Sequence, residues 1–421
     1  MVHPLSNYHI NEQRFKANFD ALSKIGATAE GGVNRPALSE ADLAARNWLR
    51  ERIETAGLEY TCDSAGNQAA TLRAHREGEP HFLLGSHLDT VPEGGCFDGA
   101  LGILAALEVL QTIQEAGYSP SVNFEAVNFT DEEGTHIGLL GSRALTGKLS
   151  PNDLLHPNLG IDAFDTGLSR LGLTREGILS AFRDPKTIAG YLELHIEQGP
   201  ILAENGDEIG IVTGIIGIHR SKLCFVGKAD HAGTTPLLKR RDAGRAASAF
   251  AAHAWETVQR EFMDCVFNVG NMRFEPGIFN VVPAVVTLDL ELRSPQVERL
   301  SILHERLLHL AHQEAKAAQT QITVTIAEEI APAYMNTAVQ SALQECAHAE
   351  SRKYRLMPSG AGHDAQSFAH ICPSGMIFIP SQAGTSHSSK EFSRWQDCVN
   401  GANLLLQAAI KLAVVKPFSD K

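Results

Sequence analysis

Hydrophobic and polar positions along the first half of the chain change repeatedly between the spacing of a strand and the spacing of a helix. Residues 82–86 form an apolar run of strand length, and residues 122–129 alternate as a strand does. Apolar positions recur at helical spacing over residues 43–56 and again over residues 98–117. A third strand is predicted at residues 191–196. This alternation predicts an α/β sheet covered by helices on both faces.

The pattern becomes richer in strands after residue 209. Four strands are predicted there, at residues 209–218, 221–227, 285–293 and 321–327. One long helix precedes the third of these strands, and another helix begins near residue 296. A segment of about 115 residues with this content predicts a smaller α+β domain inserted into the first. The chain then returns to alternation, so we expect a discontinuous first domain (1–211 and 329–421) and an inserted domain (212–328).

Composition limits the classes of protein to which the chain can belong. At 421 residues it exceeds the size of one ordinary core, which agrees with two domains. Hydrophobic residues make up 43% and charged residues 20%, as is typical of a globular protein. The net charge of −13 argues against general binding to nucleic acid or to an anionic membrane, because both require a basic surface.

Three further features concern the compartment. No apolar run approaches the roughly 20 residues that a membrane span requires. The first eight residues contain no apolar segment typical of a signal peptide. The seven cysteines are scattered, odd in number and without a C-x-x-C pair, which favours reduced thiols over a disulfide framework. We therefore expect a cytoplasmic protein.

Residues that can bind a metal follow the predicted strands. His87 and Asp89 end the first strand and share one of its faces, because residues two apart in a strand point the same way. A glycine-rich loop then leads to Asp98, and Glu132 and Glu133 follow the next strand. In an α/β sheet, ligands gather beyond the carboxyl ends of the strands, where these residues would meet.

Two histidines extend this set: His195 at the end of the third strand, and His387 in a loop rich in glycine and serine. Each residue taken alone has an ordinary explanation, since paired acids often mark a solvated turn and a single histidine is more often packed in a core. Their coincidence at several strand ends favours a metal centre instead. Imidazoles and carboxylates would suit two borderline divalent ions such as zinc, about 3.5–4 Å apart, with one carboxylate free to take a proton from water.

In several segments the chain resembles the M20 family of dinuclear metallopeptidases and amidohydrolases. These segments are His87-Leu88-Asp89-Thr90, Phe97-Asp98-Gly99, Asp131-Glu132-Glu133-Gly134, His231-Ala232-Gly233 and Ser386-His387. Residues 193–200 and 360–366 more narrowly resemble the branch that cleaves ureido groups, which contains N-carbamoyl-L-amino acid hydrolases, β-ureidopropionases and allantoate amidohydrolases. The resemblance begins near Gly31 and continues to the C-terminal helix.

The resemblance implies an α/β catalytic domain with a mixed sheet covered by helices, like that of the dinuclear zinc aminopeptidases, and an inserted lid and dimerisation domain. It also implies two divalent ions per subunit, with Zn²⁺ preferred over Mn²⁺ or Co²⁺, bridged by Asp98. The implied metal ligands are His87, Asp98, Glu133, His195 and His387. Glu132 resembles the general base, and Asp89 resembles the residue that orients His87. The peptidases of the family carry a carboxylate at the position of His195, which favours the ureido-cleaving branch.

Four residues are implied to bind the substrate. Arg293, at the end of a predicted strand, could hold a carboxylate through two hydrogen bonds, aided by the amide of Asn280. Gln198 would bind the ureido group. His231 would reach the active site of the partner in a homodimer. Without the resemblance, a strand-end arginine or a loop histidine would more often be only a surface residue.

The sequence therefore predicts metal-dependent hydrolysis of the ureido bond of N-carbamoyl amino acids to an amino acid, ammonia and carbon dioxide. Glu132 would remove a proton from water and return it to the departing amine, while the ions and His231 stabilise the negative oxygen. The alternative enzymes are allantoate amidohydrolase and a related aminoacylase or peptidase, and the alternative class is a metal-stabilised binding protein without turnover. Two segments depart from the family, Thr135-His136-Ile137 and Ile218-His219-Arg220, and could alter substrate preference.

Overall fold

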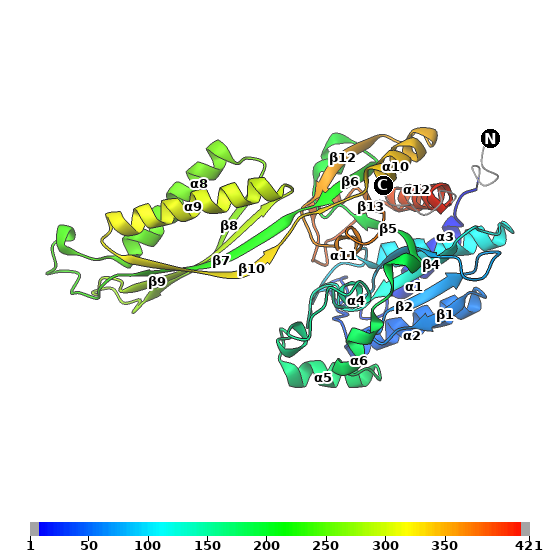
Figure 1. Cartoon of the computed structure of the whole chain (residues 1–421), viewed down its shortest axis with the longest axis horizontal. Coiled ribbons are helices and arrows are strands. Elements are labelled where there is room, and N and C mark those ends of the chain that lie inside the picture. The colour runs from blue at the N-terminus through cyan, green and yellow to red at the C-terminus, as the bar shows by residue number, and fades with distance from the viewer. Residues whose placement is uncertain (1–7, 414–421) are drawn as a thin grey trace. The chain divides into compact units, whose positions relative to one another are not determined.

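The computed structural model describes residues 8–413 and divides the chain into two compact units (Figure 1). Unit 1 combines the residues up to Thr213 with those from Tyr334 onward, and unit 2 spans Gly214–Ala333. The chain therefore leaves unit 1 and later returns to it. The boundaries expected from the sequence, 211/212 and 328/329, lie two and five residues before these.

A nine-stranded mixed sheet forms the centre of unit 1. Its strands are β1 (Glu59–Cys62), β2 (Gln68–Leu72), β3 (His81–His87), β4 (Asn123–Phe129), β5 (Ile188–Ile196), β6 (Ile209–Ile215), β11 (Ala333–Tyr334), β12 (Tyr354–Ser359) and β13 (Ser374–Ile379). Their order is β1-β2-β4-β3-β5-β13-β6-β11, and β12 pairs with β6. Strands β4, β3, β5 and β13 are mutually parallel neighbours, whereas β2 and β6 run antiparallel to the strands beside them. The predicted α/β class with a mixed sheet is confirmed.

Helices cover both faces of this sheet. They are α1 (Glu12–Leu22), α2 (Glu40–Thr55), α3 (Ala100–Glu115), α4 (Leu140–Leu145), α5 (Ile161–Arg170), α6 (Arg175–Ile178), α7 (Ile201–Asn205), α10 (Thr337–Ala349), α11 (Ala365–Phe368) and α12 (Trp395–Ala413). Helices α3 and α12 pack on one face, against Leu192 and Leu194 of β5. On the opposite face Tyr191 stacks on Phe368 of α11, with ring centroids 4.3 Å apart. Strand β5 is therefore buried on both sides, as is usual for parallel strands.

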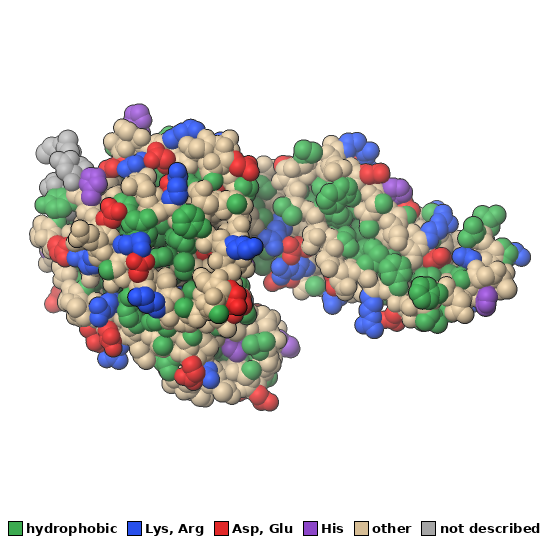
Figure 2. Space-filling view, turned by 180° about the vertical axis from the view of Figure 1, so that it is seen from behind, with side chains coloured by type: hydrophobic (Ala, Val, Ile, Leu, Met, Phe, Trp, Pro, Cys, Tyr) green, Lys and Arg blue, Asp and Glu red, His purple; other side chains and the backbone are tan. Residues whose placement is uncertain are grey.

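Unit 2 is a four-stranded antiparallel sheet with two helices on one face (Figure 1). The strands, in the order β10-β7-β9-β8, are β10 (Gln321–Ile330), β7 (Gly217–Val226), β9 (Val285–Ser294) and β8 (Val266–Glu275), and the helices are α8 (Ala243–Glu261) and α9 (Val297–Ala317). Every second residue of β9 is buried. Of these, Val286, Leu288, Leu290 and Leu292 pack in one core with α8 and α9. Hydrophobic side chains are also exposed on the surface of this unit (Figure 2).

Two local predictions are wrong. The predicted strand over residues 209–218 is interrupted at Ile216, where β6 ends and β7 begins, because one apolar pattern continues across both strands. Strand β8 was not predicted, since its side chains are mostly exposed and give no strong alternation. The helix predicted at 43–56 is α2. The sequence also predicts Ser39 as its N-cap, and this is confirmed: the Ser39 hydroxyl accepts a hydrogen bond from the Asp42 amide (3.2 Å). Within residues 8–413, no helix combines the length and hydropathy needed to cross a membrane.

Candidate metal centre

The end of β3 fixes the orientation of a buried histidine. His87 is the last residue of β3, and its Nδ1 atom lies 2.9 Å from the carbonyl oxygen of Asp89. A carbonyl can only accept a hydrogen bond, so Nδ1 carries the proton and Nε2 presents a lone pair. Burial lowers the pKa of His87 to about 4, which keeps the imidazole neutral. A neutral imidazole with a free Nε2 lone pair is a suitable metal ligand.

Asp98 lies at the centre of the site. Its carboxylate oxygens are 3.0 Å from His195 Nε2, 3.3 Å from His387 Nε2 and 3.7 Å from His87 Nε2. The next residue, Gly99, has a φ of +62°, and a Cβ atom there would lie 2.3 Å from the His87 ring. Only glycine therefore allows the chain to turn into α3 directly beneath His87.

The acidic pair follows β4 in a turn that Asp89 holds. The Asp89 carboxylate accepts hydrogen bonds from the amides of Glu132 (3.3 Å) and Glu133 (3.1 Å), and its nearer oxygen lies 3.8 Å from His87 Nδ1. Asp131, which precedes the pair, has a φ of +54°, a left-handed conformation that aspartate adopts more readily than most residues other than glycine. The turn places Glu133 Oε2 3.3 Å from His387 Nε2, and Glu132 Oε2 3.5 Å from His87 Nε2.

The predicted ligands form two overlapping groups around Asp98. One group contains His87, Asp98 and His195, and the other contains Asp98, Glu133 and His387, with the ligand atoms of each group within 4.8 Å of one another. His195 Nδ1 contacts the carbonyl of Ile196 (2.9 Å), so Nε2 is the ring nitrogen that faces Asp98 and is the one able to bind a metal. Both His195 Nε2 and Glu133 Oε1 are buried without a hydrogen-bond partner among residues 8–413. Lone pairs that face a carboxylate repel it unless a cation lies between them, so these donors fit metal ions.

Burial and like charges dominate the electrostatics. Burial, together with the neighbouring carboxylates, raises the pKa of Glu132 and of Glu133 well above the usual value. Burial also acts on Asp98, but His195, His387 and His87 together outweigh it and hold the pKa of Asp98 well below its usual value. For His195, burial alone would lower the pKa, but the nearby Asp98 and the charge of Glu193 together outweigh it and raise the pKa to about 9. Without a metal ion, positive charge on His195 therefore balances the Asp98 carboxylate 3.0 Å away.

Four further buried residues support this site. Glu391 accepts hydrogen bonds from the amides of Phe97 and Asp98 (both 3.0 Å). Glu193 and His363 form a third group of ligand-type atoms together with His195. Asp364 has two buried oxygens without a partner among the described residues. Glu193 could have been found because it shares a strand face with His195, and His363 and Asp364 lie in the segment 360–366 that marks the resemblance. Nothing in the sequence marks Glu391.

The predicted substrate-binding residues lie in different places. Gln198, in unit 1, donates a hydrogen bond from Nε2 to Asp98 Oδ2 (2.8 Å). In unit 2, His231 and Asn280 are adjacent: the Ala232 amide donates to the Asn280 carbonyl (2.9 Å). Two amides, of Gly233 and Thr234, donate to His231 Nδ1, so its Nε2 carries the proton of the neutral ring.

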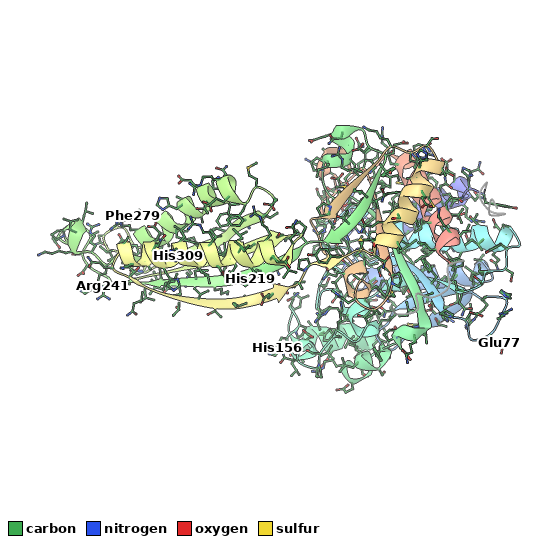
Figure 3. The ribbon with its side chains drawn as sticks, turned by 45° about the horizontal axis from the view of Figure 1, so that its top comes forward. Glu77, His156, His219, Arg241, Phe279 and His309 are labelled. Carbon is green, nitrogen blue, oxygen red and sulfur yellow. The ribbon has the colours of Figure 1, made fainter. Side chains whose placement is uncertain are left out.

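Arg293 lies at the other end of β9 from His231 and Asn280. It pairs across the sheet with Ile218, near the point where the chain enters unit 2, and its Nε contacts Glu291 (2.8 Å). Figure 3 labels His219, which pairs with the neighbour of Arg293, and Phe279, which precedes Asn280, at opposite ends of unit 2. At the rise of a β-strand, the eight steps from Val285 to Arg293 span about 27 Å.

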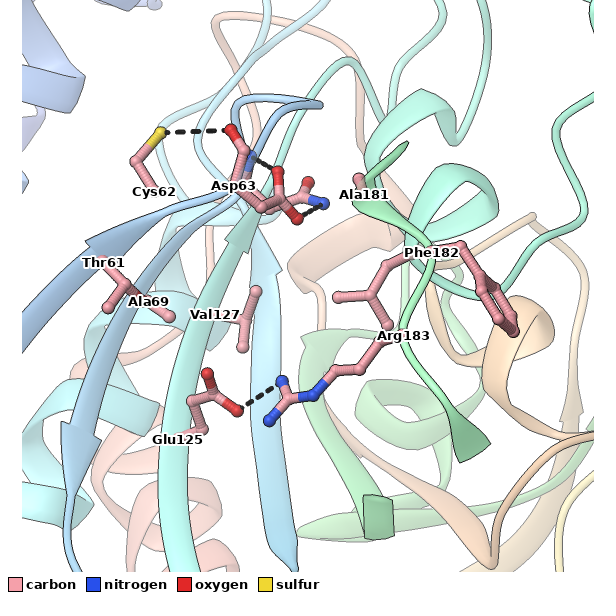
Figure 4. Close-up of a pocket in the computed structure, with 11 residues that line it drawn as sticks. Thr61, Cys62, Asp63, Ala69, Glu125, Val127, Ala181, Phe182 and Arg183 are labelled. Carbon is pink, nitrogen blue, oxygen red and sulfur yellow. Dashed lines mark hydrogen bonds and ion pairs between the residues drawn. The ribbon is translucent and has the colours of Figure 1, made fainter. Parts of the chain in front are cut away.

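Unit 1 also contains a cavity of about 260 Å³, which is distinct from the metal centre (Figure 4). Its charged groups are already paired: Glu125 contacts Arg183 Nη1 (2.7 Å) and His81 Nδ1 (3.0 Å). None of the predicted site residues lines it.

Comparison with known proteins agrees with this geometry. Residues 83–411 match Peptidase family M20/M25/M40. N-carbamoyl-L-amino acid amidohydrolase of Geobacillus stearothermophilus is 36% identical over 406 residues, which cover 96% of this chain and 99% of that protein. Allantoate amidohydrolase of Bacillus subtilis (strain 168) is 33% identical over 399 residues, covering 93% and 95%. The crystal structure of an amidase of the hydantoinase/carbamoylase family from Burkholderia multivorans has a TM-score of 0.87 at 30% identity, covering 97% of this chain and 99% of that one.

The contacts of Glu391 predict that it supports metal binding without being a ligand. Glu391→Ala leaves the amides of Phe97 and Asp98 without their acceptor, so we expect metal affinity to fall by roughly 10- to 100-fold, measured by competition with a chelator. Glu391→Gln keeps an acceptor oxygen and should restore most of the affinity. Lys390→Ala, an exposed neighbour, is the matched control. Equal affinities in all four proteins would contradict this role.

Proposed function

The chain belongs to Peptidase family M20/M25/M40, and from that premise we propose that it hydrolyses the ureido C–N bond of N-carbamoyl amino acids. The products are an amino acid, ammonia and carbon dioxide. The observation that carries the proposal is the position of Asp98 among three imidazole Nε2 atoms, with Glu132 beside them. The 36% identity to an N-carbamoyl-L-amino acid amidohydrolase supports the substrate class.

The family implies divalent metal ions, and the donors around Asp98 fit them. We propose two ions per subunit, held by His87, Asp98, Glu133, His195 and His387. Zn²⁺ is the preferred ion, with Mn²⁺ or Co²⁺ as alternatives, because imidazole and carboxylate donors together suit borderline ions. Such ions, when bound, make water more acidic and polarise the carbonyl group of the substrate.

Glu132 is the proposed general base. It lies outside both groups of metal donors, yet its Oε2 atom is 3.5 Å from His87 Nε2. Its raised pKa, caused by burial and by the nearby carboxylates, suits a group that takes a proton from water and then releases it. The proton passes to the amine nitrogen as the C–N bond breaks, and the carbamic acid that remains decomposes to ammonia and carbon dioxide.

Four residues are proposed to hold the substrate. Gln198 already donates to Asp98 and could donate to the ureido oxygen instead, while Arg293 would bind the carboxylate and Asn280 would assist. The protonated Nε2 of His231 would donate to the negative oxygen that forms during attack. His231 and Asn280 lie about 27 Å from Arg293 along β9, so one copy of unit 2 cannot bring all three residues to one small substrate.

A homodimer resolves this separation, with His231 and Asn280 supplied by the partner. Strand β8 is an edge of its sheet, and it exposes Val266 (48%) and Phe274 (39%). Trp255 of α8 is 55% exposed beside it. An exposed sheet edge with apolar side chains favours association with a second copy. All seven cysteines are free, which supports a cytoplasmic location.

Allantoate is the second candidate substrate. It carries a carboxylate and ureido groups, and the similarity to allantoate amidohydrolase of Bacillus subtilis favours it. Ammonia release should therefore be measured for N-carbamoyl α-amino acids, N-carbamoyl-β-alanine and allantoate, with Zn²⁺, Mn²⁺ and Co²⁺ in turn. We expect the highest kcat/KM for an N-carbamoyl α-amino acid and no release after chelation. A higher value for allantoate would select the second candidate, and no release from any substrate would contradict the proposal.

The same assay tests the anion-binding residue. Arg293→Ala should cost on the order of 1.5–3 kcal/mol in kcat/KM for the carbamoyl acid, because a charge-assisted hydrogen bond is lost. The corresponding carbamoyl amide, which has no carboxylate, is the matched control and should change little. An undiminished preference for the acid would exclude Arg293 from this role.

Replacement of the base should separate metal binding from turnover. Glu132→Gln preserves the shape of the side chain but cannot take a proton, so we expect activity to fall at least roughly 10²- to 10⁴-fold at unchanged metal content. Glu204→Gln, at an exposed acid of α7, is the matched control. If the metal content holds and activity stays within a few-fold of the unmodified protein, Glu132 is not the base.

The shared site predicts recovery of activity in mixed dimers. When a Glu132→Gln subunit pairs with a His231→Ala subunit, contribution from the partner places both lesions in one site and leaves the other intact. About half of the activity per dimer should then return, although both parents are inactive. A tagged pull-down must verify that subunits have exchanged. Verified mixed dimers that remain inactive would show that each lid serves its own subunit.

A further inference from the structure

A polar cavity within unit 2 takes no part in the reaction proposed above. It has a volume of about 350 Å³, and its polar lining consists of His219, Ser301, His304, Glu305 and Glu329. Ala331 and Pro332, close to the end of unit 2 at Ala333, also line it. His219 belongs to one of the two segments that depart from the family pattern.

A β-bulge brings a carboxylate to this cavity. Strand β10 pairs regularly with β7 up to Ile326, which lies opposite Ser221, but Glu328 and Glu329 then lie opposite Arg220 and His219. The extra residue, Ala327, shifts the alternation of the strand by one position. Glu328 therefore forms an ion pair with Arg220 on the open face, whereas Glu329 joins His219 on the face covered by the helices.

His219 is buried and has one ring nitrogen beside a hydroxyl and the other beside a carboxylate. It is 3% exposed, and its Nε2 lies 3.0 Å from the Ser221 hydroxyl. If Nε2 donates to that oxygen, Nδ1 presents its lone pair to Glu329 Oε1, which lies 3.7 Å away. This separation is too long for a hydrogen bond. It is close to the roughly 3.3–3.5 Å between two donors of one tetrahedral zinc ion at bond lengths of about 2.0–2.2 Å.

His304 of α9 supplies a second imidazole. Its ring centroid lies 3.7 Å from that of His219, and its Nε2 is buried without a hydrogen-bond partner among the described residues. Burial, together with the neighbouring His219, lowers the pKa of His304 to about 4, so the ring is neutral near pH 7. A neutral imidazole with an unpartnered nitrogen, close to a second imidazole and near a carboxylate, has the chemistry of a ligand rather than of a core residue.

We propose that His219, His304 and Glu329 bind one borderline divalent transition-metal ion, such as Zn²⁺, in unit 2. Glu305 lines the same cavity and is available as a fourth ligand. Among the described residues, ligand atoms already lie within 4.8 Å of one another only in groups of unit 1. In unit 2 the three side chains would therefore have to rotate toward one another to bind an ion. The Glu329 side chain is 69% exposed and can rotate toward His304. Mg²⁺ and Ca²⁺ are poor candidates because two of the three donors are imidazole nitrogens.

The ion would connect the three segments that meet at this end of unit 2. His219 lies near the start of the unit, Glu329 lies near its end, and His304 lies in the helix between them. Metal binding would therefore fix the two strands through which the chain enters and leaves the unit. The site would act on the position of those strands without contacting the substrate.

Metal content of the full-length protein tests the proposal. The protein is loaded with Zn²⁺, freed of excess ion by gel filtration and analysed for zinc per subunit. We expect the unmodified protein to hold one more ion per subunit than His304→Gln or Glu329→Gln. His309→Gln is the matched control, because His309 is an exposed histidine of the same helix (Figure 3) and should lose no ion. Glu329 is exposed, so its replacement reports on binding even if a histidine variant does not fold.

A second experiment, in a variant with a weakened metal centre in unit 1, distinguishes this ion from those of unit 1. Glu133→Gln weakens only the centre around Asp98, and the difference between it and the double variant Glu133→Gln/Glu329→Gln should still be one ion. The result would hold whether or not the chain hydrolyses carbamoyl amino acids. Equal zinc content in the unmodified, His304→Gln and Glu329→Gln proteins would overturn the proposal.

Discussion

The site depends on one carboxylate, that of Asp98, surrounded by atoms that would otherwise repel it. Three imidazole nitrogens approach it within 3.0–3.7 Å. In two of these imidazoles, His87 and His195, Nδ1 faces a backbone carbonyl, so Nε2 is the nitrogen directed at Asp98. Glu133 adds a second carboxylate to the same small volume. Such an arrangement is stable only when positive charge occupies the space between the donors. The proposed metal ions would therefore stabilise the arrangement of these side chains as well as take part in the chemistry.

The sheet makes this crowding possible. Strands β4, β3 and β5 are adjacent and parallel, so their carboxyl ends deliver Glu132, His87 and His195 to one edge. Helix α3 can pack close to β5 because Gly102 has no side chain. A Cβ atom at this position would lie only 2.4 Å from the Leu194 carbonyl oxygen. Residues with positive φ cluster here, at Asp131, Gln198 and His387. A positive φ is unfavourable for residues other than glycine. The packed strands and helices on either side of these loops therefore stabilise backbone conformations that the loops alone would avoid.

The sequence contained most of the site because strand ends are visible in a hydrophobic pattern. His87, Glu132 and His195 each follow an apolar run of strand length, and parallel strands must end at one edge. Residues that act through the backbone could not be found in this way. Glu391 holds the amides beside Asp98 from 293 positions away along the chain, and no period or spacing connects the two. The bulge at Ala327 is equally invisible, since Glu328 and Glu329 are alike in sequence and differ only in the face that each one joins.

Protons and metal ions compete for the same charge. Burial raises the pKa of Glu133, and Asp98 and Glu193 together raise the pKa of His195 to about 9 against the effect of burial. Without ions, the folded site would therefore hold these protons more tightly than the unfolded chain does. A divalent ion would displace those protons, because a metal ligand must present a lone pair. Glu132 lies outside both donor groups, so its proton need not be displaced. Burial would thus lead the neighbouring ligands to exchange their protons for metal ions. It leaves Glu132, with its raised pKa, able to gain and lose a proton during each turnover.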